Sequence, residues 1–369
     1  MDREYRKRMC TVVAGLGLGL LAATANAQPV VGSVSGVASN DQTMVIMGSA
    51  FGTKPVVAPL VWEDFDDGVL HPDLAAHGVI SANNTDNLRH SFTSRNARTN
   101  FKVTNANGDG NFYEYIGDGA PKWFVQYWIK LASNWSWGTT AYGGGNDGLA
   151  NIKFFRMFPN GGRTYTNAGY SMHGFSGGDV MRFVEKGAQP YLGVDGRSWF
   201  TPNTWHNVQV LYGDSGLDQA NGTMKLWVDG VLRDSMTTVV TNIGSDGSAT
   251  DKRPYVIGFY DSWAPSDASV SNMYGYYGDI YVDNNWSRVE LGDASTYVNT
   301  RHREIQIPTA WGASSVSVKI NQGSFGSGQI GYLYVTDSLG RVNANGFPVT
   351  IGGGTVTPPS APTNLRVVR

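Results

Sequence analysis

The chain has 369 residues and a formal net charge of −2, so it lacks the basic excess expected of a nucleic-acid-binding protein. Only 16% of its residues are charged, whereas 41% are hydrophobic, and glycine (47), tryptophan (11) and tyrosine (18) are abundant. This composition excludes wholesale disorder, and the length predicts two or three domains. Few charges with many glycines and aromatic residues are typical of an all-β extracellular protein with long turns.

Residues 1–27 are predicted to be a secretory signal peptide. Four basic residues precede an apolar stretch at 11–24, and Ala25-Asn26-Ala27 supplies a small-residue cleavage site. A membrane anchor is the alternative, which the short and glycine-rich apolar run disfavours. The only cysteine, Cys10, lies in this segment, so the mature chain is expected to contain no disulfide. We expect secretion from a bacterial cell, with no membrane contact once the signal is removed.

The two ends of the mature chain are predicted to form one small domain. Alternating strands at 30–34 and 43–47 flank a polar turn, but two strands cannot form an independent core. Further alternating strands at 315–320, 332–335 and 347–351 supply the missing partners.

Motifs at these ends resemble a bacterial IPT/TIG immunoglobulin-like domain. Its opening is Ser33-Val-Ser-Gly36 followed by residues 45–52, and its end begins at Trp311-Gly-Ala-Ser-Ser-Val-Ser-Val318. The resemblance implies an Ig-like domain made of residues 28–59 and 303–351, interrupted by a large insertion. Such a domain is normally a spacer or adhesion module and contributes no catalytic residues.

The insertion, residues 60–293, consists of strand-like runs between turns. The clearest hairpin has Asp229-Gly230 as its two-residue turn, and no long run has helical periodicity. Strands without helices over this length predict a sandwich or jelly roll. Segments 205–210, 222–230 and 277–283 resemble concanavalin A-like lectin/glucanase domains, a group that includes LamG and jelly-roll polysaccharide lyase domains.

The predicted fold class is therefore all-β, with a concanavalin-like jelly-roll sandwich and a small Ig-like β-sandwich. Residues 352–369 are predicted to be a Gly/Pro-rich linker and tail. Within this tail, segment 363–368 resembles the first strand of a fibronectin type III domain.

Three strand-like runs between residues 123 and 175 contain the candidate site. Successive side chains of a strand point to opposite faces. On the second run this predicts one face with Lys153, Phe155 and Met157, and an opposite face with Ile152, Phe154 and Arg156. We expect Lys153 and His173 to project into one groove beside Gln126 or Trp128.

β-Elimination of a uronate-containing glycan is the enzyme hypothesis for this groove. The reaction needs cations or hydrogen-bond donors on the carboxylate, a tyrosine or histidine base, and an acid for the leaving oxygen. The layout resembles glucuronan- and alginate-lyase sandwiches, which place a lysine on one concave strand and tyrosine or arginine on its neighbours. In this reading Lys153 neutralises the carboxylate and His173 or Tyr170 supplies the base. The predicted catalytic residues are Lys153, His173, Tyr170, Arg156 and Tyr142.

The predicted partner is an extracellular polysaccharide, since aromatic rings bury the C–H surface of sugars. The predicted substrate-binding residues are Gln126, Trp128, Trp137, Ser171, Arg182, Tyr260 and Trp263. One alternative function is that of a non-catalytic glycan-binding or adhesion protein. A second is a glycoside hydrolase using Glu114 and Asp179, although the Glu-x-Asp-x-x-Glu spacing of laminarinase-type enzymes is absent. For the site residues themselves the alternative is that Lys153 and Arg156 are solvated strand residues and His173 is an ordinary hydrogen-bonded one.

Four aspartates near the two ends of the insertion predict a structural calcium site: Asp64, Asp66, Asp67 and Asp279. Calcium takes six to eight oxygen ligands, which acidic loops can supply. Concanavalin-like domains often bind calcium where their first and last strands meet. Turn formation is the alternative role of these aspartates. No organic cofactor is predicted, and the scattered histidines lack the spacing of a zinc site.

Overall fold

The computed structural model describes residues 27–78, 80–101, 110–135, 152–159, 168–173, 179–184, 191–242, 252–260 and 272–353. Within these ranges the chain forms strands and the short 3-10 turns η2 (Gly196–Trp199) and η4 (Tyr297–Asn299), with no α-helix. The prediction of an all-β fold is confirmed. No helix of this part of the chain is long and apolar enough to span a membrane.

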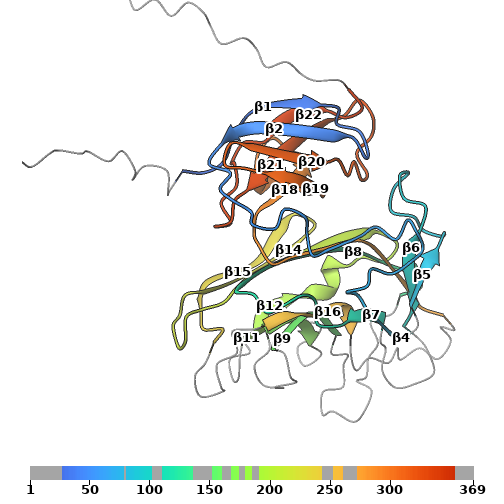
Figure 1. The fold of residues 1–369 in the computed structure, drawn as a ribbon. Coiled ribbons are helices and arrows are strands. Elements are labelled where there is room, and N and C mark those ends of the chain that lie inside the picture. The colour runs from blue at the N-terminus through green and yellow to red at the C-terminus, as the bar shows by residue number, and fades with distance from the viewer. Residues whose placement is uncertain are drawn as a thin grey trace, which may run out of the picture.

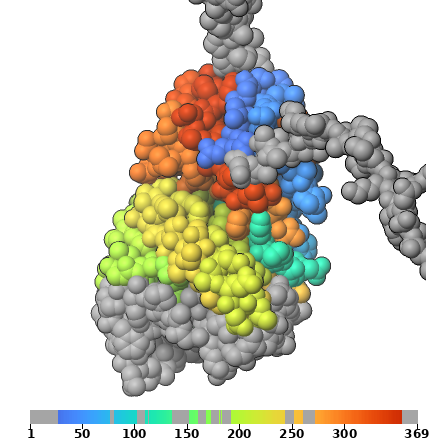
Figure 2. Space-filling view, turned by 90° about the vertical axis from the view of Figure 1, so that its left-hand side faces the viewer, coloured from blue at the N-terminus to red at the C-terminus, as the bar shows by residue number. Residues whose placement is uncertain are grey.

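The first sheet, called here the terminal sheet, joins both ends of the chain. Its order is β1 (Val30–Gly36), β2 (Thr43–Ser49), β20 (Ser315–Lys319), β19 (Arg303–Trp311), β18 (Arg288–Gly292), β21 (Ile330–Thr336) and β22 (Phe347–Thr350). Buried residues from all of these strands except β19 form a separate hydrophobic core. In Figure 2, segments from the two ends, blue and red, lie against each other. We call the strands of this sheet, together with the loops that join them, the terminal unit.

Two further sheets build the inserted region. The middle sheet has the order β15 (Val231–Val239), β14 (Gly222–Val228), β13 (Trp205–Gly213), β8 (Lys122–Leu131), β17 (Tyr274–Asp283), β6 (Asn96–Asn100) and β5 (Ile80–Asn84), and β3 (Val61–Glu63) also pairs with β17. The outer sheet has the order β12 (Tyr191–Asp195), β11 (Asp179–Val184), β10 (Ala168–His173), β9 (Ile152–Pro159), β16 (Lys252–Tyr260), β7 (Gly110–Tyr113) and β4 (Ala76–Gly78). In Figure 1 the middle sheet lies between the terminal unit and the outer sheet.

The predicted boundary of the insertion at residue 293 differs from the observed pairing by one strand. Strand β18 pairs with β19 and β21, both in the terminal sheet, instead of with an inserted strand. Its side chains Val289 and Leu291 lie in the terminal core. The insertion into the terminal sheet therefore ends before Arg288.

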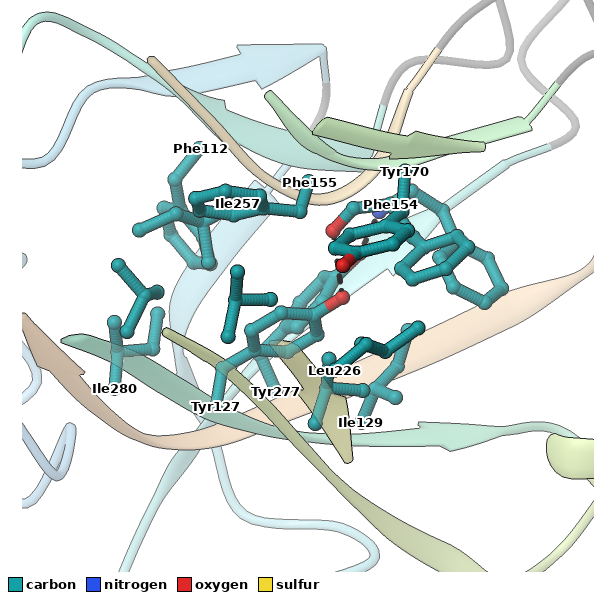
Figure 3. Close-up of a cluster of buried hydrophobic side chains, with 14 of the residues drawn as sticks. Phe112, Tyr127, Ile129, Phe154, Phe155, Tyr170, Leu226, Ile257, Tyr277 and Ile280 are labelled. Carbon is teal, nitrogen blue, oxygen red and sulfur yellow. Dashed lines mark hydrogen bonds between the residues drawn. The ribbon is translucent and has the colours of Figure 1, made fainter. Parts of the chain in front are cut away.

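Alternation along β8 divides its side chains between two layers. Trp123, Val125, Tyr127, Ile129 and Leu131 are at most 1% exposed and belong to the core between the middle and outer sheets. Figure 3 shows Tyr127 and Ile129 within this core. Phe124, which lies between Trp123 and Val125 in sequence, packs instead in a third cluster with Ile305 of the terminal sheet. The terminal unit therefore covers the other face of the middle sheet.

Buried ion pairs and hydrogen bonds connect the terminal unit to the middle sheet. The Arg89 guanidinium contacts Asp279 on β17 and lies 2.7 Å from Glu304 on β19, and all three side chains are at most 1% exposed. Lys54 pairs with Asp283 at 2.7 Å in an equally buried position. Charges this deeply buried require partners. The ion pairs thus hold the two layers in one relative position.

The predicted hairpin at Asp229-Gly230 is confirmed. It joins β14 to β15, and its two residues have positive φ angles of 50° and 67°. Positive φ at both central positions is the signature of a type I′ turn, which matches the twist of the flanking strands. The Gly230 carbonyl accepts a hydrogen bond from Arg303, so the turn also contacts the terminal unit.

Replacing Gly230 by alanine is expected to destabilise the protein by about 1–3 kcal/mol more than replacing Gly328. Both residues have positive φ, so both variants carry the same backbone penalty. A Cβ at Gly230 would collide with the Thr300 carbonyl, whereas one at Gly328 would meet nothing within 4 Å. Denaturant unfolding of both variants measures the difference. Equal losses would show that the turn does not press against the terminal unit.

Candidate functional site

The outward face of the outer sheet carries two cationic residues of β9, and a β-bulge brings them together. Lys153 pairs with Ser171 of β10, while Phe155 pairs with Tyr170, so Phe154 is the extra residue. Phe154 and Phe155 therefore both enter the core, where each is fully buried. The predicted alternation, which separated Lys153 from Arg156, is wrong because it assumed an unbroken strand.

The position of Arg156 follows from its partner on β10. Arg156 pairs with Gly169, which lies between the core residues Ala168 and Tyr170. A Cβ at Gly169 would lie 2.8 Å from the Cδ atom of Arg156, so the arginine stem crosses the outward side of that glycine. Arg156 is 2% exposed and Lys153 is half-buried. The two cations thus share the outward face.

Two buried polar side chains extend this face. Ser171 lies between the core residues Tyr170 and Met172, and Asn111 of β7 precedes the core residue Phe112. Both polar residues are 0% exposed, and within the described part of the chain Ser171 Oγ and Asn111 Oδ1 have no hydrogen-bond partner. Buried polar atoms of native proteins usually have partners, so these two atoms represent unused hydrogen-bonding capacity on this face.

The strand register places further residues beside Lys153 and Ser171. Tyr260 of β16 pairs with Lys153, and His173 of β10 pairs with Asp179 of β11. The side chains of these three partners lie outside the described residues. From the register, the backbone positions of Tyr260, Lys153 and Ser171 form one line across three adjacent strands, about 10 Å wide at the usual strand spacing.

We name this set, Asn111, Lys153, Arg156 and Ser171, the outer-sheet site. Lysine and arginine together favour an anionic ligand, and arginine binds a carboxylate through a planar pair of N–H groups. The hydroxyl and amide groups add hydrogen-bonding capacity for sugar hydroxyls. Chemically, the site can hold a polyhydroxylated ligand with a carboxylate against the outward face of the outer sheet. Asn111 was missed from the sequence, since a lone asparagine on a short strand gives no signal there.

Tyr170 and Arg182 do not belong to the outer-sheet site, contrary to the prediction. Tyr170 is fully buried and stacks on Phe154 with ring centroids 6.1 Å apart, and Figure 3 shows both rings in the core. Its hydroxyl donates a hydrogen bond of 2.9 Å to Asp234 of β15, to which Arg182 is also ion-paired. Burial, with the Asp234 charge, raises the pKa of Tyr170 well above its usual range. A core tyrosine of this kind cannot act as the base.

The Tyr170→Phe variant is expected to retain full activity and glycan binding while losing about 1–3 kcal/mol of stability. The substitution removes one donor from the buried Asp234 carboxylate and leaves the outward face unchanged. Thermal unfolding and turnover of wild type and variant are to be compared. A large loss of turnover at unchanged stability would restore Tyr170 to a catalytic role.

Gln126 and Trp128 were predicted to face the groove, but they face the terminal unit. Gln126 is 0% exposed and accepts a hydrogen bond from Gln209, which also donates to Glu290 of β18. Trp128 is 4% exposed, and its ring lies 5.3 Å from that of His302. Strand alternation does place Gln126 and Trp128 on one face of β8, but no local pattern indicates that the chain ends cover this face.

Five predicted site residues lie wholly or in their side chains outside the described part of the chain. Tyr142, Trp137 and Trp263 lie outside the described residues. His173 and Tyr260 are placed by the strand register alone. Their assignments to catalysis and to sugar binding stay predictions.

Of the four aspartates predicted to bind calcium, Asp64, Asp66 and Asp279 line one cavity between the middle sheet and the terminal unit. Asp67 accepts a hydrogen bond from the Val69 backbone, as a turn residue does. Asp279 is ion-paired with Arg89, and no group of three or more acidic or histidine side chains in the described ranges could hold a metal ion. Calcium therefore stays a prediction of the sequence, to which the geometry adds no support.

No protein-family model and no curated protein sequence matches the chain. Similar solved structures include an endo-β-1,4-glucuronan lyase from the fungus Trichoderma reesei, with 11% identity, a TM-score of 0.41, and coverage of 61% of this chain and 95% of that one. The alginate lyase Aly36B gives 11% identity, a TM-score of 0.38, and coverage of 69% and 98%. The cellulose induced protein Cip1 gives 14%, 0.37, and coverage of 61% and 97%.

Proposed function

We propose that the outer-sheet site binds an extracellular, uronate-containing polysaccharide and cleaves it by β-elimination. The observation that carries the proposal is the bulge that puts Lys153 and Arg156 on one outward face with the buried polar atoms of Ser171 and Asn111. Cations and donors fixed in place stabilise charge that develops on a carboxylate more effectively than water does.

In the proposed reaction, Lys153 and Arg156 hold the uronate carboxylate. A base removes the proton from the adjacent ring carbon, and the electron pair of that C–H bond forms a carbon–carbon double bond as the bond to the leaving oxygen breaks. The leaving oxygen takes up a proton from an acid. With Tyr170 confined to the core, His173 is the proposed base, and Tyr260, whose backbone pairs with Lys153, is the proposed acid.

One experiment distinguishes the proposed lyase from the two alternatives, a non-catalytic binding protein and a glycoside hydrolase. Wild-type protein is incubated with polyuronates and with neutral glucans, and the ultraviolet absorbance of unsaturated products and the retention of the protein on each polymer are recorded. A lyase releases unsaturated products from polyuronate alone. Retention on polyuronate without products identifies a binding or adhesion protein, and saturated reducing ends identify a hydrolase. Absence of both retention and products with every polyuronate would contradict the proposal.

We also propose that the protein acts outside the cell, because residues 1–27 have the pattern of a secretory signal. The mature protein is then expected to begin at Gln28. Mass spectrometry of protein recovered from the culture medium identifies the first residue. Recovery of the full-length chain inside cells only would contradict this localisation.

A further inference from the structure

The cavity lined by Asp64, Asp66 and Asp279 lies between the terminal unit and the middle sheet, apart from the outer-sheet site. Its volume is about 260 Å³. The terminal unit contributes Asp41 and Lys319, and the inserted region contributes Asp64, Asp66 and Asp279. Pockets for drug-sized ligands measure roughly 300–1,000 Å³, so this cavity suits a single small ring.

The lining of this junction cavity is strongly acidic. Four carboxylates face one lysine, and that lysine is already paired with Asp41 at 2.7 Å. Burial raises the pKa of Asp64, and the neighbouring charges of Asp66 and Asp279 act in the same direction. Because Arg89 is paired with Asp279 and Lys319 with Asp41, the excess of negative charge comes from Asp64 and Asp66. This excess favours a cationic ligand and disfavours a uronate.

A buried carboxylate oxygen of the cavity lacks a donor. Asp279 is 1% exposed, and its Oδ2 atom is taken up by Arg89 and by Asn321, the latter at 3.0 Å. Its Oδ1 atom has no hydrogen-bond partner within the described ranges. Nε2 of His90, which lines the same cavity, also has no hydrogen bond there and lies 3.8 Å from Asp279 Oδ2. A ligand with N–H and O–H groups would satisfy these atoms.

Aromatic side chains complete the lining. Trp62 of β3 and Phe92, which is 40% exposed, border the cavity beside the acidic residues. Aromatic faces pack against the C–H surface of sugar rings and attract cations. A bare metal ion would use neither ring, and the described acidic and histidine residues form no metal-binding group. The lining thus fits an organic cation with a ring.

We infer that the junction cavity binds a protonated amino sugar, with the ammonium and hydroxyl groups on the carboxylates of Asp64, Asp66 and Asp279 and the ring against Trp62 or Phe92. This site is independent of the proposed lyase activity, because its lining comes from the middle sheet and the terminal unit, whereas Lys153 and its neighbours lie on the outer sheet. Figure 1 shows the middle sheet between the terminal unit and the outer sheet.

Calorimetric titration of the whole protein with glucosamine, glucose, glucuronate and calcium at slightly acidic pH tests the inference. Glucosamine is expected to bind at least about tenfold more tightly than glucose, a difference of one charge-assisted contact, and glucuronate is expected not to bind. Asp64→Asn keeps the side-chain shape and is expected to weaken glucosamine binding by about tenfold or more. Phe92→Ala, at an exposed position, is expected to weaken it as well.

The matched controls are Asp86→Asn, at an exposed aspartate paired with Arg98, and Lys153→Ala on the outer sheet. Both variants are expected to bind glucosamine like wild type. Since Lys153→Ala changes only the proposed lyase site, the glucosamine test does not depend on whether the lyase proposal holds. Equal affinity for glucose or glucuronate would overturn the inference. Glucosamine binding that survives both Asp64→Asn and Phe92→Ala would overturn it too, as would calcium binding at Asp64 without any glucosamine binding.

Discussion

Replacing Arg89 by methionine is expected to lower the free energy of unfolding by about 3–5 kcal/mol at neutral pH. The guanidinium contacts Asp279 of the middle sheet and Glu304 of the terminal sheet, and none of the three side chains is more than 1% exposed. Methionine fills much of the same volume but leaves two carboxylates buried without their cation. Such uncompensated buried charge is strongly destabilising.

This loss should depend on pH in a defined direction. Burial opposes the charged form of Glu304, but Arg89, followed by His302, holds the pKa of Glu304 below its ordinary value of 4.5. A lowered pKa in the folded state contributes stability above pH 4.5, and this contribution is lost as the pH falls. The difference between wild type and Arg89→Met is therefore expected to shrink below about pH 4.5.

Arg98→Met is the matched control, because Arg98 and its partner Asp86 are 36% and 70% exposed. Surface pairs contribute about 0–1 kcal/mol, so this variant should unfold nearly like wild type. Chemical denaturation across pH measures both variants. Arg89→Met with wild-type stability at neutral pH would show that this ion pair does not join the terminal unit to the middle sheet.

Lys153→Ala is expected to reduce turnover of a uronate polymer by about 10²–10³-fold. The reason is the loss of a fixed cation at the carboxylate on the outward face of β9. Because Lys153 is half-buried and outside the hydrophobic core, stability should change by no more than about 1 kcal/mol. If the protein binds without cleaving, the same variant is expected to lose affinity for polyuronate instead.

Lys225→Ala provides the control for this experiment. Lys225 is also a half-buried lysine within a strand, but it lies on β14 of the middle sheet, away from the outer-sheet site. Its removal should leave both turnover and binding at wild-type levels. Equal effects of the two substitutions would point to a general contribution of positive charge, and wild-type turnover in Lys153→Ala would refute the site.

Much of the fold follows from local sequence patterns. Period-two alternation accounts for the buried face of β8, and the Asp229-Gly230 turn predicted the β14–β15 hairpin. These features depend on neighbouring residues, so a single sequence is enough to reveal them. The cationic character of β9 was recognised for the same reason.

The errors concern contacts between segments distant in the chain. No local pattern indicates that Phe154 bulges out of register, yet this bulge brings Arg156 to the face of Lys153. The partner that draws Tyr170 and Arg182 inward is Asp234, more than fifty residues away. Likewise, the burial of Trp128 requires His302 of the terminal unit, which only the folded chain places beside it.

The most direct test of the outer-sheet site is a titration with a uronate oligosaccharide, followed by nuclear magnetic resonance of protein whose lysines carry ¹³C-dimethyl groups. Dimethylation retains the positive charge, and a Lys153→Arg variant assigns the Lys153 signal. We predict that the Lys153 signal shifts in a saturable manner while the Lys225 signal stays in place. An unmoved Lys153 signal at an oligosaccharide concentration that saturates binding would contradict the account.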